Sequence, residues 1–158
     1  MHRVYKAPTV IDLEVTDVCN EKCRHCLNFD RDYSLGSASL NFDQLDRIID
    51  EVLEAEVFHV ILSGGESFVN FEVLEYGIKK LSEKNVSVSV CSNLSIKGNR
   101  VDRIKRLRDA GLDHILTSLI SHDPVVCDYM VNAVGAYERI ITGIEDCVEN
   151  GIRVSANM

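Results

Sequence analysis

Short apolar runs alternate with longer helical patterns along the chain, and this alternation limits the folds that are open to it. The short runs have the composition and length of β-strands. They are expected at residues 10–16, 58–63, 86–92, 114–121 and 152–158. Because an intervening helix provides the crossover that two parallel strands need, the pattern predicts an α/β fold with a parallel sheet.

Four helix candidates lie between these strands, and their ends carry recognisable signals. Asn41 opens the first helix, and Gln44 follows three residues later as the partner in a capping box. Further helix starts are expected at Asn70 and Asn99, a helix stop at Gly111, and a left-handed C-cap at Asn150 and Gly151. Apolar residues recur at helical spacing, as in Leu45, Ile48, Ile49, Val52 and Leu53, and again in Tyr137, Ile140, Ile141, Ile144 and Val148.

The number of strands indicates an incomplete (β/α) fold. Five strands and four helices do not close an eightfold (β/α) barrel. The last expected strand runs to Met158, so an open parallel sheet would keep a bare edge of the kind that natural proteins usually cover. At 158 residues and 46% hydrophobic, the chain can bury one sizeable core. We therefore expect residues 1–158 to form one unit of parallel strands and helices that is incomplete at its C-terminus.

Charge and hydropathy exclude several classes of partner. The net charge of −8 argues against a nucleic-acid backbone as the main partner, and the basic run from Lys97 to Arg108 is typical of a solvated helix face. No stretch approaches the roughly 18 to 20 apolar residues that cross a bilayer, and the first residues lack the apolar region of a secretory signal. These features predict a cytoplasmic protein without a nucleic-acid or membrane partner. In that compartment its six cysteines are expected to be ligands or core thiols.

Three cysteines, Cys19, Cys23 and Cys26, form a Cys-x3-Cys-x2-Cys motif directly after the first expected strand. Three thiolates in such a short loop can hold one face of an iron–sulfur cube and leave the fourth iron open to a small molecule. Structural zinc is the competing metal, but it normally needs a fourth ligand, and His25 adjoins Cys26 too closely to share one tetrahedral ion with it. The motif thus favours an iron–sulfur cluster over zinc or inert thiols, while Cys147 is expected to be a buried core thiol.

Other polar residues follow the remaining strands. Active groups of (β/α) proteins gather at the carboxyl ends of the strands. At these positions lie Gly64-Gly65-Glu66, Ser92 and Asn93, Ser118 and Ser121, and Asn157. All of them are expected at the same pole of the sheet as the three cysteines, which predicts a functional site there.

The two motifs together resemble the radical S-adenosylmethionine (SAM) superfamily. The resemblance rests on Cys-x3-Cys-x2-Cys after a first strand and Gly-Gly-Glu after a second, and it extends from about Val10 to Met158. Residues 58–66 and 135–157 are similar to the branch that often carries a C-terminal SPASM domain. The resemblance implies a six-stranded partial barrel, of which this chain would supply strands one to five and lack the C-terminal remainder.

The resemblance also implies cofactors and the residues that bind them. Cys19, Cys23 and Cys26 would ligate a [4Fe-4S] cluster, and its open iron would bind SAM. Gly64, Gly65 and Glu66 would receive the SAM amino group, because glycines permit close backbone approach and Glu66 offers an anionic partner. By position, His25 would lie near the adenine, Ser118 near the ribose, and Ser92 and Asn93 would either contact SAM or form a turn.

The chain departs from the family pattern at three places. Ser67 replaces the usual proline after Gly-Gly-Glu, and Leu94 replaces the glycine of Thr-Asn-Gly. Ile120 stands where relatives commonly carry an acidic residue, which leaves Asp123 and Asp128 in the following loop as substitutes.

The expected function is a radical SAM enzyme core, served by an electron donor such as flavodoxin or ferredoxin. SAM cleavage would give a 5′-deoxyadenosyl radical that abstracts hydrogen from a peptide or protein side chain or, alternatively, from a tetrapyrrole or small metabolite. Two other readings stay open, a non-catalytic fragment or binding module and a zinc-stabilised interaction domain.

Overall fold

The computed structural model describes residues 8–27 and 38–158. Five parallel strands form one sheet in the order β1-β2-β3-β4-β5, as the alternation of strands and helices predicted. The strands are β1 (Val10–Thr16), β2 (His59–Gly64), β3 (Ser87–Cys91), β4 (His114–Ser118) and β5 (Arg153–Asn157). The helices are α1 (Phe42–Glu54), α2 (Phe71–Glu83), α3 (Arg100–Asp109), α4 (Pro124–Val131) and α5 (Ala136–Glu149), with a 3-10 turn η2 (Ser67–Asn70) before α2.

Apolar residues of the helices and strands meet in one core. Every second residue of the strands points to this core, as in Val60 and Leu62 of β2 and Val88 and Val90 of β3. The helices contribute Leu45, Ile49, Leu74, Ile78, Leu81, Ile104 and Leu107, each no more than 1% exposed. Each such side chain stabilises the fold by roughly 1.5–3 kcal/mol through burial. Cys147 of α5 lies in the same core, as predicted.

The helices begin and end near the residues that the sequence indicated, but two of the expected N-cap side chains do not cap their helices. Asn41 and Gln44 form the predicted capping box, with both hydrogen bonds present. Gly151 follows α5 at φ +81°, which is the left-handed conformation that the sequence indicated. Asn70 and Asn99 precede α2 and α3, but neither side chain caps its helix. Asn70 instead donates to the carbonyls of Val15 and Leu40 and so ties β1 to the segment before α1.

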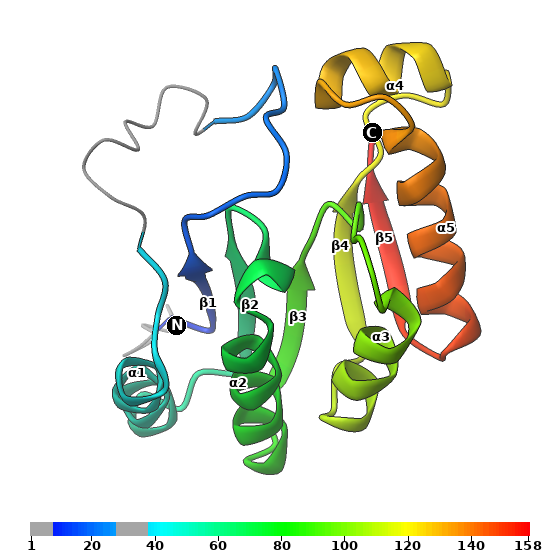
Figure 1. Cartoon of the computed structure of the whole chain (residues 1–158). Coiled ribbons are helices and arrows are strands. Elements are labelled where there is room, and N and C mark those ends of the chain that lie inside the picture. Colours follow the sequence, from blue (N-terminus) through cyan, green and yellow to red (C-terminus); the bar gives the residue numbers. More distant parts are fainter. Residues whose placement is uncertain (1–7, 28–37) are drawn as a thin grey trace, which may run out of the picture.

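Helix α4 is a correction to the sequence analysis, which expected β4 to continue to residue 121 and a loop to follow. The strand ends at Ser118, and α4 begins at Pro124 beyond the carboxyl ends of β4 and β5 (Figure 1). The Asp123 carboxylate accepts hydrogen bonds from the Val125 and Val126 amides and caps this helix. Asp128 accepts from the Gly135 and Tyr137 amides and holds the start of α5. Both aspartates thus serve as helix caps.

No helix in the described ranges is both long and apolar enough to cross a membrane.

Candidate functional site

The carboxyl ends of the five strands meet at one edge of the sheet, and the residues singled out in the sequence lie there (Figure 1). The cysteine loop (residues 17–27) follows β1, Gly64 ends β2 with Gly65 and Glu66 after it, and Ser92 and Asn93 follow β3. Ser118 and Asn157 end β4 and β5, where they are register partners. The structure therefore brings these segments together although they are far apart in the sequence.

The glycine turn packs directly on the backbone that leads into the cysteine loop. The Gly65 amide donates to the Thr16 carbonyl at 2.8 Å, and the Glu66 amide donates to the Val18 carbonyl at 2.9 Å. A Cβ at Gly64 would lie 2.0 Å from the Thr16 oxygen, and one at Gly65 would lie 2.4 Å from the Val18 oxygen. Both glycines are therefore needed for the contact between β1 and β2. Their contact with the SAM amino group stays a prediction.

Glu66 is 1% exposed, so its carboxylate faces the protein interior. One oxygen accepts from the Phe68 amide at 3.0 Å and the Ser92 hydroxyl at 2.8 Å, and the other accepts from the Asn93 amide at 2.7 Å. Burial raises the pKa of this carboxyl, and the hydrogen bonds oppose that shift. Glu66 thus joins the loops after β2 and β3. The geometry gives it a structural role beside the cofactor role that the resemblance implies.

The loop after β3 is held in an unusual conformation. Leu94 has φ +54° although it carries a side chain, and it occupies the position where the family often has glycine. Left-handed backbone costs such a residue roughly 1–2 kcal/mol. The Ser92 hydroxyl accepts from the Leu94 amide, and the Leu94 side chain is fully buried against Gly143 of α5. Burial and this bond offset the strain, so the turn keeps its shape without the glycine.

Asn93 connects this loop to the cysteine loop. Its side-chain amide donates to the Asn20 side chain at 2.8 Å, and Asn20 in turn donates to the Ser95 carbonyl at 3.1 Å. Ser67, which replaces the family's proline, donates to the Cys91 carbonyl and so ties the glycine turn to β3. The loops after β1, β2 and β3 therefore form one hydrogen-bonded assembly.

The cysteine loop is also attached to α4. The Arg24 amide donates to the Met130 carbonyl at 2.8 Å, and the Arg24 side chain donates to Tyr129 and Asn132 while lying over the Tyr129 ring. Cys23 packs against a small cluster of apolar residues on α4 and α5, namely Cys127, Val131, Ala136 and Ile140. Helix α4, which the sequence analysis missed, thus supports the loop.

The three thiols differ in exposure, since Cys19 and Cys23 are partly buried and Cys26 is exposed. Burial, followed by the nearby Cys19 and Cys26, raises the pKa of Cys23 to about 11, and burial also raises the pKa of Cys19. Within residues 8–27 and 38–158, no three His, Cys, Asp or Glu side chains converge at metal-binding distance. Three neighbouring soft sulfur donors nevertheless fit an iron–sulfur cluster, whose binding would displace the thiol protons and draw the loop together.

The remaining predicted residues, His25 and Ser118, are both exposed at this pole. Sequence reasoning did not single out Asn20, Glu21 or Arg139, which the structure places beside the cysteines. The positions of Asn20 and Glu21 inside the Cys-x3-Cys spacing were a usable signal. No signal in the sequence marked Arg139, because it is one of several charged residues in a helical pattern.

The face of the sheet opposite the core is polar. Side chains on it hydrogen-bond across strands, as Ser89 does with His114, His114 with Ser155, and His59 with Ser87, all at 2.9 to 3.0 Å. Ser63 likewise donates to Asp12. This face of the sheet therefore carries hydroxyl, imidazole and carboxylate groups.

Comparison with known proteins identifies relatives of the whole described fold. A family model described as "Radical SAM superfamily" matches residues 13–158. A probable GTP 3′,8-cyclase of Methanococcus maripaludis is 32% identical over 143 residues, which cover 89% of this chain and 46% of the relative. An AdoMet-dependent heme synthase of Methanosarcina barkeri is 30% identical over 142 residues, covering 88% of this chain and 39% of the relative. The chain thus spans less than half the length of these relatives.

Solved structures share the fold. HydG, a maturase of the [FeFe]-hydrogenase, superposes with a TM-score of 0.72 at 20% identity, over 97% of this chain and 36% of HydG. SuiB of Streptococcus suis bound to S-adenosylmethionine gives a TM-score of 0.69 at 17% identity, over 95% of this chain and 40% of SuiB. These matches confirm the predicted partial (β/α) barrel. The SPASM-type branch stays a prediction.

Proposed function

Because the chain belongs to the radical SAM superfamily, whose members use a [4Fe-4S] cluster and SAM, we propose that it forms the core of such an enzyme. When bound, these cofactors supply reductive cleavage of SAM to a 5′-deoxyadenosyl radical, which abstracts a hydrogen atom from the substrate. In this proposal residues 1–158 supply strands one to five of the family's barrel. The match of 97% of the chain to 36% of HydG supports that assignment.

One observation carries the proposal: the glycine turn is bonded to the backbone that leads into the three-cysteine loop. The two hydrogen bonds from Gly65 and Glu66 place the turn beside Cys19 at the carboxyl end of the sheet. A cluster held by Cys19, Cys23 and Cys26 would therefore lie next to the backbone of the turn. This arrangement suits a ligand that must touch both the cluster and the protein.

The other residues of the site would hold the loops in place around the bound SAM. Asn93 and Asn20 hold the loops after β3 and β1 at a constant separation. Glu66 accepts hydrogen bonds from Ser92 and Asn93 and so anchors the loop after β3. In this proposal the exposed His25 and Ser118 would contact the adenine and the ribose of SAM. A low-potential electron donor such as flavodoxin or ferredoxin would approach from the exposed side of the cysteine loop.

We propose a small polar metabolite as the substrate, in preference to the peptide side chain first expected. The hydroxyl, imidazole and carboxylate groups of the sheet's polar face match a substrate rich in hydrogen-bonding groups. The cyclase relatives, whose names specify GTP, support the same class of substrate.

The cofactor proposal is tested by anaerobic reconstitution. Iron and acid-labile sulfide are measured, SAM and dithionite are added, and 5′-deoxyadenosine is assayed. We expect a cluster and nucleoside formation in the unaltered protein and neither in the variant with Cys19, Cys23 and Cys26 changed to alanine. Cys147→Ala is the matched control, because this buried core thiol lies in α5. Bound zinc without sulfide, or equal nucleoside formation in the triple variant, would contradict the proposal.

The substrate class is tested with the same assay. Nucleotides such as GTP and unrelated peptides are added in turn, and the rate of 5′-deoxyadenosine formation is compared. A nucleotide should raise the rate, and Ser89→Leu, which removes the hydroxyl that bonds to His114 on the polar face, should reduce that rise. Stimulation by peptides alone would favour the original expectation instead.

A further inference from the structure

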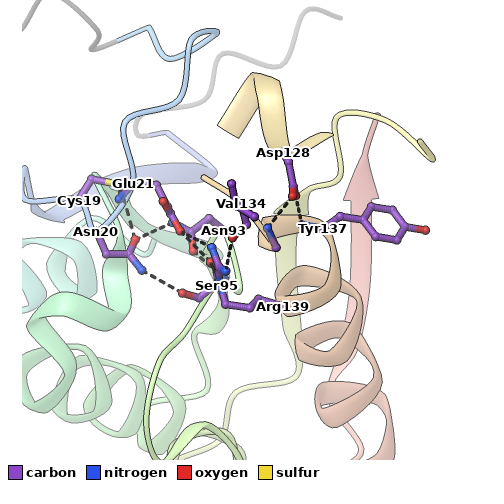
Figure 2. Close-up of polar contacts among 10 residues, drawn as sticks. Cys19, Asn20, Glu21, Asn93, Ser95, Asp128, Val134, Tyr137 and Arg139 are labelled. Carbon is purple, nitrogen blue, oxygen red and sulfur yellow. Dashed lines mark hydrogen bonds and ion pairs between the residues drawn. The ribbon is translucent and has the colours of Figure 1, made fainter. Parts of the chain in front are cut away.

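A buried polar network connects the cysteine loop to two distant parts of the chain (Figure 2). The Glu21 carboxylate accepts a hydrogen bond from the Ser95 hydroxyl at 2.8 Å and forms an ion pair with Arg139 Nη2 at 3.3 Å. The Ser95 hydroxyl in turn accepts from Arg139 Nε at 2.8 Å. The Glu21 side chain is only 8% exposed. A carboxylate buried to this degree is stable only where its partners are fixed in place.

Hydrogen bonds hold all three guanidinium nitrogens of Arg139. Its three guanidinium nitrogens bind Ser95, Glu21 and the Val134 carbonyl, so each nitrogen has a partner from a different segment. The start of α5 is fixed as well, because Asp128 accepts from the Gly135 and Tyr137 amides (Figure 2). Arg139 therefore presents a fixed cation to Glu21.

Glu21 lies between Cys19 and Cys23 in the chain, so its side-chain contacts with Ser95 and Arg139 attach this part of the cysteine loop to the rest of the protein. The Glu21 amide lies 3.5 Å from Cys19 Sγ and donates to that sulfur. Hydrogen bonds to ligating sulfurs and nearby charges set the reduction potential of an iron–sulfur cluster. Fixing the Glu21 side chain thus fixes the N–H group that is directed at a cluster ligand.

We propose that Glu21, Ser95 and Arg139 are positioning residues that hold the cysteine loop at the carboxyl end of the sheet and set the reduction potential of the cluster that it binds. This inference rests on the proposed function, since it takes Cys19 and Cys23 as ligands. The network reaches the cysteines from α5 and from the loop after β3, which are 118 and 74 residues from Glu21 in the chain.

Another ion pair serves as a matched control. Arg100 pairs with Asp146, and the two side chains are 18% and 16% exposed, so this pair is comparably buried. It joins α3 to α5 and, among the residues that the structure describes, makes no hydrogen bond with the cysteine loop. Arg100→Met therefore removes an arginine from a comparable ion pair without releasing Glu21.

The experiment compares the reconstituted unaltered protein with Arg139→Met, Ser95→Ala, Arg139→Lys and Arg100→Met. Cluster content is measured as iron and sulfide, and the midpoint potential by redox titration followed by electron paramagnetic resonance. Arg139→Met should load less cluster and shift the potential to more negative values, because the reduced cluster loses a nearby cation and a fixed sulfur hydrogen bond. Ser95→Ala should give a smaller shift in the same direction without any change of charge. Arg139→Lys should restore part of the loss, and Arg100→Met should leave the potential unchanged.

The outcomes separate this inference from the proposed function. If the unaltered protein takes up no cluster, the proposed function fails. If it takes up a cluster whose potential and spectrum are the same in all variants, the positioning role is overturned while the proposed function stands. A loss of SAM affinity in Arg139→Met with an unchanged potential would also overturn it, because Arg139 would then act on SAM directly.

Discussion

Two loops at the same pole of the sheet are built in opposite ways. The turn at Gly64–Glu66 is packed so closely on β1 that a Cβ has no room, and its carboxylate is buried with three hydrogen-bond donors. The cysteine loop lies further out, with Cys26 exposed, and it is attached at a few side chains such as Glu21 and Arg24. The turn is therefore part of the folded core. The cysteine loop is attached to that core at a few side chains, and its proposed function is to supply the cluster ligands.

The largest loss of stability is expected from Gly64→Ala. The new methyl carbon would lie 2.0 Å from the Thr16 oxygen at a φ of +135°, so β1 and β2 would have to separate. We expect the free energy of unfolding to fall by about 3 kcal/mol or more, measured by chemical denaturation. Gly98→Ala is the control, because Gly98 also has positive φ but has no atom within 4 Å of the added carbon. Equal losses in both variants would show that backbone strain alone is responsible.

Glu66→Gln should have the next largest effect. The amide group would replace an oxygen that accepts a buried hydrogen bond, which costs about 2 kcal/mol of unfolding free energy. The stability of the folded protein should also depend on pH through Glu66. Because the pKa of Glu66 is raised in the folded state, stability falls as the pH rises from its ordinary value through the folded value. Urea denaturation across this range should show the slope in the unaltered protein and lose it in the variant.

Asp128→Ala should cost less, about 1 kcal/mol, because it removes a cap from the start of α5. Hydrogen bonds from the Tyr137 and Gly135 amides hold the pKa of Asp128 below its usual range. The stabilisation is therefore present above the ordinary pKa of an aspartate and is lost as the pH falls through the lowered value. The difference in unfolding free energy between the unaltered protein and Asp128→Ala should therefore shrink as the pH falls, measured by urea denaturation at several pH values. A difference that does not change with pH would contradict this role of the carboxylate.

The smallest effect on stability is expected from Cys26→Ser, with a change within about 0.5 kcal/mol because the residue is exposed. The same variant should nevertheless lose its cluster, measured as iron and sulfide after reconstitution. This result would sharpen the contrast between the loops, since the glycine turn would fail by unfolding and the cysteine loop by losing a ligand. A large drop in the denaturation midpoint of the metal-free variant would contradict it.

Local patterns predicted the parts of the molecule that local chemistry decides. The capping box of Asn41 and Gln44 needs only four successive residues, and it formed as expected. Helix α4 was missed because the segment with Asp123 and Asp128 was expected to be a loop, although Asp123 and Pro124 formed a usable helix-start signal. The strand that begins at His114 was predicted to reach residue 121, but it ends at Ser118.

The sequence by itself determined the order of the five strands, the parallel sheet and the pole at which the cysteines, glycines and polar residues gather. These features follow from hydrophobic periodicity and from the need of parallel strands for crossovers. Only the tertiary structure decided that Glu66 points inward to Ser92 and Asn93, and that Arg139 reaches Glu21 across 118 residues. Such contacts depend on how the helices and loops pack in three dimensions, and no local pattern encodes which distant side chain will lie opposite a buried charge.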